Sequence, residues 1–409
     1  MKCRHCGAVL ALPLIDLGSA PPSNAYLTAE ALHAPEKWFP LRVLVCTGCW
    51  LAQTEDYAGA SELFTPDYAY FSSFSSTWLE HAERYVAEMT TRFGLGKTSN
   101  VVEIAANDGY LLQYVKARGI PCLGVEPTAS TAAAARKKGI EIVEEFFGVA
   151  LARKLADSGR QADLVAANNV VAHVPDINDF LRGFAVLLKP QGVATVEFTH
   201  LLRLVEDNQF DTVYHEHFSY LSLTASVRIF ESNGLSVFDV EEIPTHGGSL
   251  RVFAQRSDTG THLRTSRLET LLLREAEAGM LTADYYVRFQ DRARRTKNEF
   301  IGFLLDACKQ GKSVAAYGAA AKGNTLLNYA GIRSDLISFV VDRNPAKVGK
   351  YLPGSHIPIV DESRLASDKP DYVIIFPWNL KSEIVSQLDY VNIWGGKFVI
   401  AIPGLELQQ

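Results

Sequence analysis

Short apolar runs alternate with helical patterns along the middle of the chain. Apolar positions recur with helical spacing over 85–93, 110–118 and a segment that ends at 188, and the runs between them have the length of buried strands. This alternation predicts an α/β domain with a largely parallel sheet. The predicted strands cover 101–104, 122–125, 163–169 and 193–198, with a turn at 189–192 before the last.

The same alternation returns near the C-terminus. Long helical patterns occupy 262–310, and a turn of small residues from Gly318 to Asn324 follows a strand and opens a helix. A second α/β unit is therefore predicted. Its strands cover 312–317, 336–341, 372–376 and 397–400.

The N-terminal part is marked by cysteines. Cys3 and Cys6 form one C-x-x-C pair, and Cys46 and Cys49 form a second. Two such pairs can place four thiolates around Zn²⁺, and a four-thiolate site is closed to substrate, so it would be structural. The gap between the pairs is longer than in a zinc ribbon and predicts a small subdomain. Redox-active or incidental cysteines are the alternative.

Length and charge narrow the class of protein. A chain of 409 residues is too long for one compact core, and we expect domains over 1–66, 67–255 and 256–409. The formal net charge of -6 gives no attraction to nucleic acid or to anionic membranes. The sequence has no apolar run near the ~20 residues that span a bilayer and no signal-peptide pattern. We therefore expect a cytoplasmic protein that is a monomer or a weak homo-oligomer.

The turn after the strand 101–104 bears on the cofactor. Glu103 and Glu126 stand at the ends of the first two strands, where ligands of such sheets bind. The turn between them has one glycine, Gly109, next to Asp108, and so lacks the G-x-G-x-x-G pattern that receives a pyrophosphate. A carboxylate there would repel phosphate but tolerate S-adenosylmethionine, which carries none. A purely structural turn is the alternative.

A second polar stretch, "QFDTVYHEHFSYLSL", has Tyr214, His215, Glu216 and His217 in succession. It could be a metal site, an acid/base site or a polar segment around buried aromatic residues. The metal interpretation lacks an H-E-x-x-H spacing. Histidine suits a general base, because its ordinary pKa lies near neutrality.

Seven motifs, in this order, cover nearly the whole chain. Together they resemble the sugar C-methyltransferases that act on nucleotide-linked keto-deoxysugars. The motifs are the two C-x-x-C pairs, "YFSSFSS", "VEIAANDG", "AANNVVAHVP", "FDTVYHEHF", "HGGSLR" and "YGAAAKGNTLLNY".

The resemblance implies three parts and a reaction. It implies a zinc domain, a central class I methyltransferase domain that uses S-adenosylmethionine, and a C-terminal Rossmann-like domain that helps to hold the nucleotide-sugar. The sugar carbon would be deprotonated to an enolate and then take the methyl group in line. The chain departs from the family at Ala105, where glycine is usual, and at Ala106, where cysteine is frequent. Alanine at 105 is strained if its φ is positive.

The resemblance also assigns roles to residues. His217 would be the base, and its neighbour His215 stands at a position that varies in the family. Roles for Tyr214, Glu216 and His217 together do not fit a flat strand, so an irregular turn is predicted. The catalytic set would be Tyr70, Tyr214, Glu216 and His217. The cofactor set would be Glu103, Asn107, Asp108, Gly109, Glu126 and Asn168. The substrate set would be His246, Arg251, Lys322 and Asn324, where Arg251 suits a phosphate and Lys322, beside a helix N-terminus, a diphosphate.

Two other functions stay open from the sequence. An NAD-dependent oxidoreductase would use the second α/β unit, with Asp342 on the ribose, although its Gly-x-x-x-x-Gly turn lacks the full fingerprint. A non-catalytic zinc-ribbon binding or regulatory protein on a degenerate methyltransferase scaffold would be consistent with Ala105.

Overall fold

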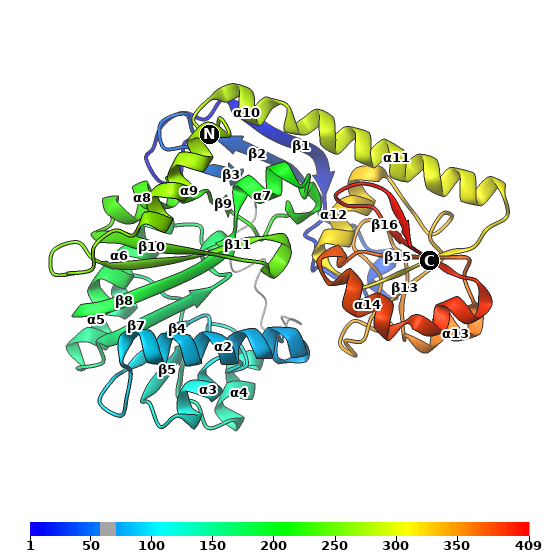
Figure 1. Cartoon of the computed structure of the whole chain (residues 1–409). Coiled ribbons are helices and arrows are strands. Elements are labelled where there is room, and N and C mark those ends of the chain that lie inside the picture. Colours follow the sequence, from blue (N-terminus) through cyan, green and yellow to red (C-terminus); the bar gives the residue numbers. More distant parts are fainter. Residues whose placement is uncertain (58–70, 409) are drawn as a thin grey trace.

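The computed structural model describes residues 1–57 and 71–408, and these residues form three sheets joined by helices (Figure 1). Tyr70, one of the predicted catalytic residues, lies outside the described residues. In the part of the chain that is described, no helix has the length and apolar character needed to cross a membrane.

The N-terminal sheet is antiparallel and takes its last strand from the middle of the chain. β9 pairs with β3 through Ala52 opposite Tyr220 and Gln53 opposite Ser219. Because β9 begins just after His217, the N-terminal sheet holds one end of the "YHEH" stretch. The strand order is β1 (Leu12–Ala20), β2 (Phe39–Val45), β3 (Ala52–Thr54) and β9 (Ser219–Tyr220).

The central sheet contains the first predicted α/β unit. Its strands from β6 to β8 are parallel, and β11 and β10 extend it antiparallel. The order is β10 (Leu235–Ile243), β11 (Ser249–Arg256), β8 (Leu188–Thr199), β7 (Ala162–Asn168), β4 (Val101–Ile104), β5 (Cys122–Val125) and β6 (Ile142–Val143).

The sequence pattern found these strands well. β4 and β5 have the predicted bounds. β8 runs from Leu188 to Thr199, and its ladder with β7 pairs Ala162 with Leu188 and then Leu164 with Val193. Residues 189–192 bulge out of this ladder, and a Cβ on Gly192 would lie 3.1 Å from the backbone nitrogen of Lys189, so the chain turns back where the turn was predicted.

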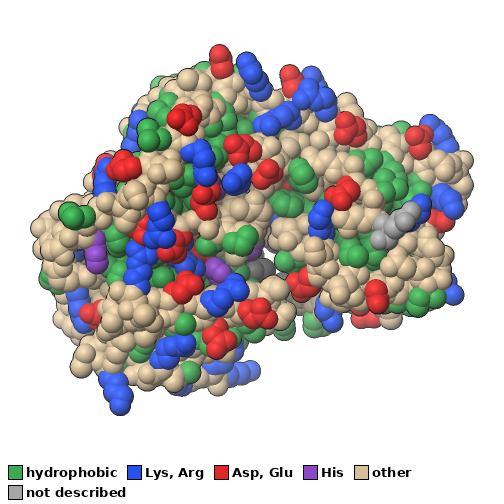
Figure 2. All heavy atoms as spheres, in the orientation of Figure 1, with side chains coloured by type: hydrophobic (Ala, Val, Ile, Leu, Met, Phe, Trp, Pro, Cys, Tyr) green, Lys and Arg blue, Asp and Glu red, His purple; other side chains and the backbone are tan. Residues whose placement is uncertain are grey.

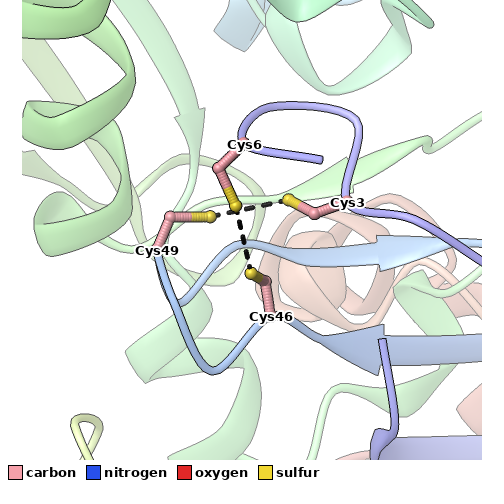
Figure 3. Close-up of side chains that lie close together, drawn as sticks. All are labelled: Cys3, Cys6, Cys46 and Cys49. Carbon is pink, nitrogen blue, oxygen red and sulfur yellow. Dashed lines mark hydrogen bonds between the residues drawn. The ribbon is translucent and has the colours of Figure 1, made fainter. Parts of the chain in front are cut away.

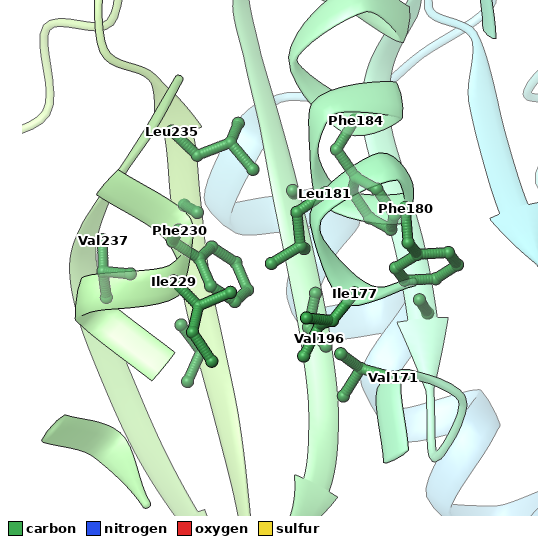
Figure 4. Packing of buried hydrophobic residues seen from close by; sticks show 14 of the residues in the cluster. Val171, Ile177, Phe180, Leu181, Phe184, Val196, Ile229, Phe230, Leu235 and Val237 are labelled. Carbon is green, nitrogen blue, oxygen red and sulfur yellow. The ribbon is translucent and has the colours of Figure 1, made fainter. Parts of the chain in front are cut away.

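Helices cover both faces of the central sheet because successive strand residues point to opposite sides. Val102 and Ile104 face the core under α5, α6 and α8, whereas Val101 faces the core under α2, α3 and α4. On the first face, Leu181 of α6 points toward Phe230 of α8, whereas Phe180 and Phe184 lie on the other side of α6 (Figure 4), with ring centroids 5.6 and 5.5 Å from that of Phe147. The helices are α2 (Ser76–Phe93), α3 (Leu112–Ala117), α4 (Ala129–Lys137), α5 (Val149–Asp157), α6 (Ile177–Leu187) and α8 (Leu223–Ser232).

The third sheet is the second predicted α/β unit. It is parallel except for its last strand. The order is β14 (Ile359–Val360), β13 (Val340–Val341), β12 (Val314–Tyr317), β15 (Tyr372–Ile375), β16 (Lys397–Ile400) and β17 (Glu406–Gln408). Its helices are α12 (Ala321–Ala330), α13 (Ser363–Asp368) and α14 (Lys381–Gln387).

One hydrophobic core joins the N-terminal sheet to the third sheet. Leu14 and Ile15 of β1 belong to the same buried cluster as Phe300 of α11 and Ile374 of β15. The long helix α11 runs from the N-terminal sheet to the third sheet (Figure 1). The connecting helices are α7 (Leu201–Glu206), α9 (Ser266–Glu277), α10 (Ala283–Val287) and α11 (Phe289–Lys309).

The described part of the chain also contains short 3₁₀ turns: η1 (Ala31–His33), η2 (Ser72–Phe74), η3 (Val171–His173), η4 (Phe210–Thr212), η5 (Thr245–Gly247), η6 (Trp378–Leu380) and η7 (Asp389–Trp394).

The turn between β4 and α3 is left-handed at three positions. Ala105 has φ +56°, Asn107 has φ +50° and Gly109 has φ +75°. Glycine adopts this region freely and asparagine tolerates it, but for alanine it costs about 1–2 kcal/mol because Cβ crowds the following carbonyl oxygen. Ala105 is therefore the strained member of the turn.

We predict that Ala105→Gly stabilises the protein by about 0.5–1 kcal/mol, because relief of the left-handed strain exceeds the extra chain entropy of glycine. Thermal unfolding followed by circular dichroism measures this. The neighbouring Ala106 is fully buried and has no positive φ, so Ala106→Gly is the matched control and should destabilise. A lower unfolding midpoint for Ala105→Gly would contradict the strain.

Candidate functional site

Four cysteine thiols converge at the N-terminal sheet (Figure 3). Sγ of Cys3 lies 3.6 Å from Sγ of Cys49, Sγ of Cys6 lies 3.5 Å from Sγ of Cys46, and all four sulfurs lie within 4.8 Å of one another. Four sulfurs bound tetrahedrally to Zn²⁺ at 2.3 Å are about 3.8 Å apart, so the cluster has the size of such a site. The predicted zinc-binding cluster is confirmed.

The predicted cofactor residues meet at the carboxyl ends of β4, β5 and β7. The carboxylate of Glu126 accepts hydrogen bonds from the backbone N–H groups of Asn107 and Thr128, both at 2.9 Å. Asp108 in the same turn lies 3.6 Å from Lys138 Nζ. The left-handed turn is thus fastened to the end of the neighbouring strand, which fixes the rim of the site.

Buried polar groups at this rim indicate a ligand. Within the described residues, neither side-chain polar atom of Asn168 has a hydrogen-bond partner. Burial raises the pKa of Glu103 well above its usual value, a hydrogen bond with Tyr110 opposes this shift, and the carboxylates of Glu126 and Asp108 raise the pKa further. The carboxylates of Glu126 and Asp108 fit a ligand that brings hydroxyl and amino groups, and they would repel a pyrophosphate.

The "YHEH" stretch forms a turn, as predicted. The N–H of His217 donates to the carbonyl of Tyr214 at 3.0 Å, and the two rings lie 3.9 Å apart between centroids. An i to i+3 turn places these two side chains together, where a strand would place them on opposite faces.

The ring orientation of His217 is fixed from one side. Its Nδ1 lies 3.0 Å from the carbonyl oxygen of Thr212, which can only accept, so Nδ1 carries the proton and Nε2 carries the lone pair. Burial lowers the pKa of His217 well below 6.5, and His173, His246 and Lys322 lower it further. The neutral imidazole is therefore the stable form, with Nε2 as the proton acceptor.

A second histidine lies beside it and was not assigned a role from the sequence. The ring centroid of His173 is 4.7 Å from that of His217, and its Nδ1 is 2.7 Å from the carbonyl oxygen of Glu216. Burial lowers the pKa of His173 to about 4. His173 stands in the motif "NNVVAHVP" at the end of β7, so the sequence pointed to this segment. Only the fold brings η3, which carries His173, next to the turn that carries His217.

Glu216 connects the turn to the N-terminal part. Its carboxylate accepts hydrogen bonds from the backbone N–H and side-chain Nδ2 of Asn24, at 3.3 and 3.1 Å. Its other oxygen, Oε2, has no partner among the residues that the structure describes. Burial raises the pKa of Glu216 above its usual value. His215 contacts the carbonyls of Phe39 and Pro40 at 3.3 and 3.2 Å.

Two predicted substrate residues lie near His217. His246 has φ +55°, its ring is 5.2 Å from that of Trp78, and burial followed by the charge of Lys322 lowers its pKa to about 4. Lys322, at the start of α12, donates to Oδ1 of Asn379 at 2.8 Å. Figure 2 shows that the surface is hollowed between the part that carries α2 and the part that carries α14.

Two other predicted substrate residues, Arg251 and Asn324, are buried and bonded to other residues of the protein. Arg251 pairs with Glu197 at 2.7 Å and with Glu88 and Glu241 at 3.1 Å, and is 3% exposed. The placement of Arg251 therefore gives no support to a phosphate contact. Asn324 is 1% exposed and donates from Nδ2 to the carbonyl of Ser23 at 2.6 Å.

In the second α/β unit, the polar groups that an NAD site would use are bonded to other residues of the chain. Where the ribose and the phosphates would lie, Asp342 accepts hydrogen bonds from the N–H groups of Ala319 and Asn344, both at 2.8 Å. The hydroxyl of Tyr26 donates to the carbonyl of Ala319 at 2.6 Å, and Lys347 Nζ donates to it at 2.8 Å. The chain's own N-terminal segment occupies the turn that an NAD site would need.

Three family models match successive parts of the chain. Residues 3–64 match the family described as "Putative zinc binding domain", residues 78–240 match "Methyltransferase domain", and residues 244–403 match "C-methyltransferase C-terminal domain". The C-methyltransferase NovU of Streptomyces niveus is 35% identical over 402 residues, which are 98% of this chain and 95% of that protein. A ubiquinone biosynthesis O-methyltransferase of Azorhizobium caulinodans is 30% identical over 101 residues, 24% of this chain and 40% of that protein.

Solved structures of methyltransferases overlap with part of the chain. The magnesium protoporphyrin IX methyltransferase of Synechocystis covers 44% of this chain and 79% of its own at a TM-score of 0.34 and 16% identity. A 1,6-didemethyltoxoflavin-N1-methyltransferase of Burkholderia thailandensis covers 51% of this chain and 96% of its own at a TM-score of 0.37 and 17% identity.

The central sheet, its acidic rim and the family match define a methyltransferase. The relative that matches over nearly the whole length is more specific, and the chain belongs to the C-methyltransferase family that includes NovU.

We predict that Cys6→Ala lowers the zinc content and the unfolding midpoint, because three thiolates no longer close the tetrahedral site and its metal-binding energy is part of the folding energy. Metal analysis and thermal unfolding measure the two effects. Cys308→Ala is the matched control, since Cys308 is an exposed thiol on α11, and it should change neither. Full zinc content in Cys6→Ala would refute the four-thiolate site.

Proposed function

We propose that the protein is an S-adenosylmethionine-dependent C-methyltransferase that acts on a nucleotide-linked keto-deoxysugar through an enolate. The observation that carries the proposal is the orientation of His217, whose Nδ1 is held by Thr212 so that Nε2 is free to take a proton. C-methylation needs a carbon nucleophile, and a keto group beside a C–H bond is the usual means of making one.

The cofactor pocket supports the choice of S-adenosylmethionine. Glu126 and Glu103 lie at the strand ends where ribose hydroxyls and an amino group would find acceptors, and Asn168 has unused hydrogen-bonding capacity. Together with Asn107, Asp108 and Gly109 these residues would hold the cofactor, which supplies an electrophilic methyl group.

The chain's own residues would make the sugar carbon nucleophilic. Nε2 of His217 would take the proton from the carbon next to the keto group, and Tyr214, whose ring lies tilted at 34° beside the imidazole, would hydrogen-bond the keto oxygen as it becomes negative. The pKa of His217 is low without substrate, but an anionic substrate beside the imidazole would raise it. Tyr70 and Glu216 would complete the substrate side.

The cofactor is tested by calorimetric titration with S-adenosylhomocysteine and with NAD. S-adenosylhomocysteine is expected to bind and NAD is not, because Tyr26 and Asp342 fill the second crevice. Tight NAD binding without S-adenosylhomocysteine binding would favour the oxidoreductase instead.

The base is tested with His217→Asn, in which the amide Nδ2 can still donate to Thr212 while the proton acceptor is lost. Exchange of the sugar C–H with deuterium from solvent, followed by mass spectrometry over a panel of nucleotide-linked ketosugars, should fall at least about 100-fold. S-adenosylhomocysteine binding should be unchanged.

The control for this substitution is His33→Asn, because His33 is exposed on η1 and should exchange normally. Undiminished exchange in His217→Asn would assign the base to another group, with His173 next to be tested.

A further inference from the structure

Three short turns and the start of α12 meet through one indole ring. Trp378 of η6 donates from Nε1 to Oδ2 of Asp211 in η4 at 2.7 Å. Asp211 is 2% exposed, and its Oδ1 has no partner in the described part of the chain. The contact joins the "FDTVYHEHF" stretch to the third sheet and uses a buried carboxylate that no role assigned so far explains.

The indole is confined from the side of the "HGGSLR" motif. Gly247 has φ +91°, and a Cβ on it would lie 2.4 Å from a ring carbon of Trp378. The carbonyl of Gly247 is in turn held by Nε2 of Gln209 at 2.7 Å. Only glycine fits at this position, so Gly247 makes room for the ring.

The face of the indole carries the ammonium group of Lys322. Nζ lies 4.2 Å from the ring centroid of Trp378 and donates to Asn379 at 2.8 Å. An ammonium over an indole face is attracted by the ring quadrupole. Two contacts bring the ammonium toward both histidines: Thr325, one helical turn after Lys322, donates to the carbonyl of Val213 at 2.8 Å, and Gly247, next to His246, lies against the indole. The charge of Lys322 also contributes to the low pKa values of His217 and His246.

We propose that Asp211 and Trp378 are positioning residues: Asp211 anchors the indole, and the indole with Asn379 holds the Lys322 ammonium beside His217, where it receives an anionic oxygen of the substrate. This rests on the proposed function. The oxygen belongs either to the diphosphate of the bound substrate or to the enolate formed on it, and kinetics separate the two.

The groups around Lys322 set the pH range of this arrangement. Burial lowers the pKa of Lys322 to about 8, and the negative charge of Asp211 opposes that shift. Burial raises the pKa of Asp211 to about 6, and Lys322 opposes it. Between these values the carboxylate is ionised and the ammonium is protonated, while His217 and His246 are neutral.

The first test needs no substrate. Reductive ¹³C-methylation makes lysines visible to NMR, and the signal missing in Lys322→Arg is that of Lys322. Its titration midpoint should lie near 8 and should fall by about 0.5–1 unit in Asp211→Asn, because the neutral amide no longer favours the ammonium.

The matched control is Asp335→Asn, an exposed acid before β13 at the opposite end of the sheet, which should leave the midpoint in place. An unchanged midpoint in Asp211→Asn would overturn the proposal.

The second test is kinetic. Asp211→Asn and Trp378→Phe should each lower kcat/KM about tenfold. The kcat/KM of the double variant should be no lower than that of the less active single variant, because both residues act through one contact. Thermal unfolding of each variant shows whether it is folded. Multiplicative losses in folded variants would mean that the residues act separately, and the positioning role would be wrong.

The kcat and KM values then identify the anion. Weaker binding of substrate and of a free nucleoside diphosphate at unchanged kcat assigns Lys322 to the diphosphate. A lower kcat and slower deuterium exchange at unchanged binding assign it to the enolate oxygen. If the unaltered protein exchanges no nucleotide-linked ketosugar, the proposed function fails, while the NMR titration still decides whether Asp211 controls Lys322.

Discussion

The reaction centre depends on how a short stretch of backbone, residues 212–220, is held by two other parts of the chain. From the N-terminal sheet, β3 pairs with β9, and the hydroxyl of Thr54 donates to the carbonyl of His217 at 3.0 Å. From the third sheet's side, the hydroxyl of Thr325 on α12 donates to the carbonyl of Val213 at 2.8 Å. His217, the proposed base, is therefore placed by parts of the protein that lie outside the methyltransferase sheet.

This constraint gives the zinc cluster an indirect role in the chemistry. Cys46 and Cys49 flank the turn between β2 and β3, and Gln53 of β3 donates to Sγ of Cys3 at 3.3 Å. A metal that fixes this turn also fixes β3, and through β3 it fixes β9 and the carbonyl of His217. The closed cluster then contributes rigidity, while the proposed function leaves proton transfer to the imidazole of His217.

Sequence reasoning succeeded where the information is local. β4 and β5 were predicted residue by residue because each is a short apolar run between clear helical segments. The C-x-x-C pairs are also local, whereas the turn at Tyr214 to His217 was predicted from the roles that the family resemblance implies. From the sequence alone, strain at Ala105 could be predicted only if its φ is positive, because the sign of φ depends on the path of the chain after this residue.

What the sequence could not supply is pairing over long distances. β9 pairs with a strand from the N-terminal part, and nothing within Ser219–Tyr220 indicates that partner. Arg251 looks like a phosphate ligand by type, yet three carboxylates from separate elements surround it. His173 needed the fold to reach His217. Such contacts depend on tertiary packing, which local propensity does not encode.

The second α/β unit shows that a repeated fold need not repeat its ligand. Its first turn has small residues and a helix behind it, which by pattern could receive phosphates. The structure places Tyr26 and Lys347 on the carbonyl of Ala319, and Asn324 on the carbonyl of Ser23. The crevice binds the protein's own N-terminal segment, which also presents Asn24 to Glu216. The unit also lies against residues 212–220 through the contact of Thr325 with the carbonyl of Val213, and the proposed function uses the charge of Lys322 at the start of its first helix.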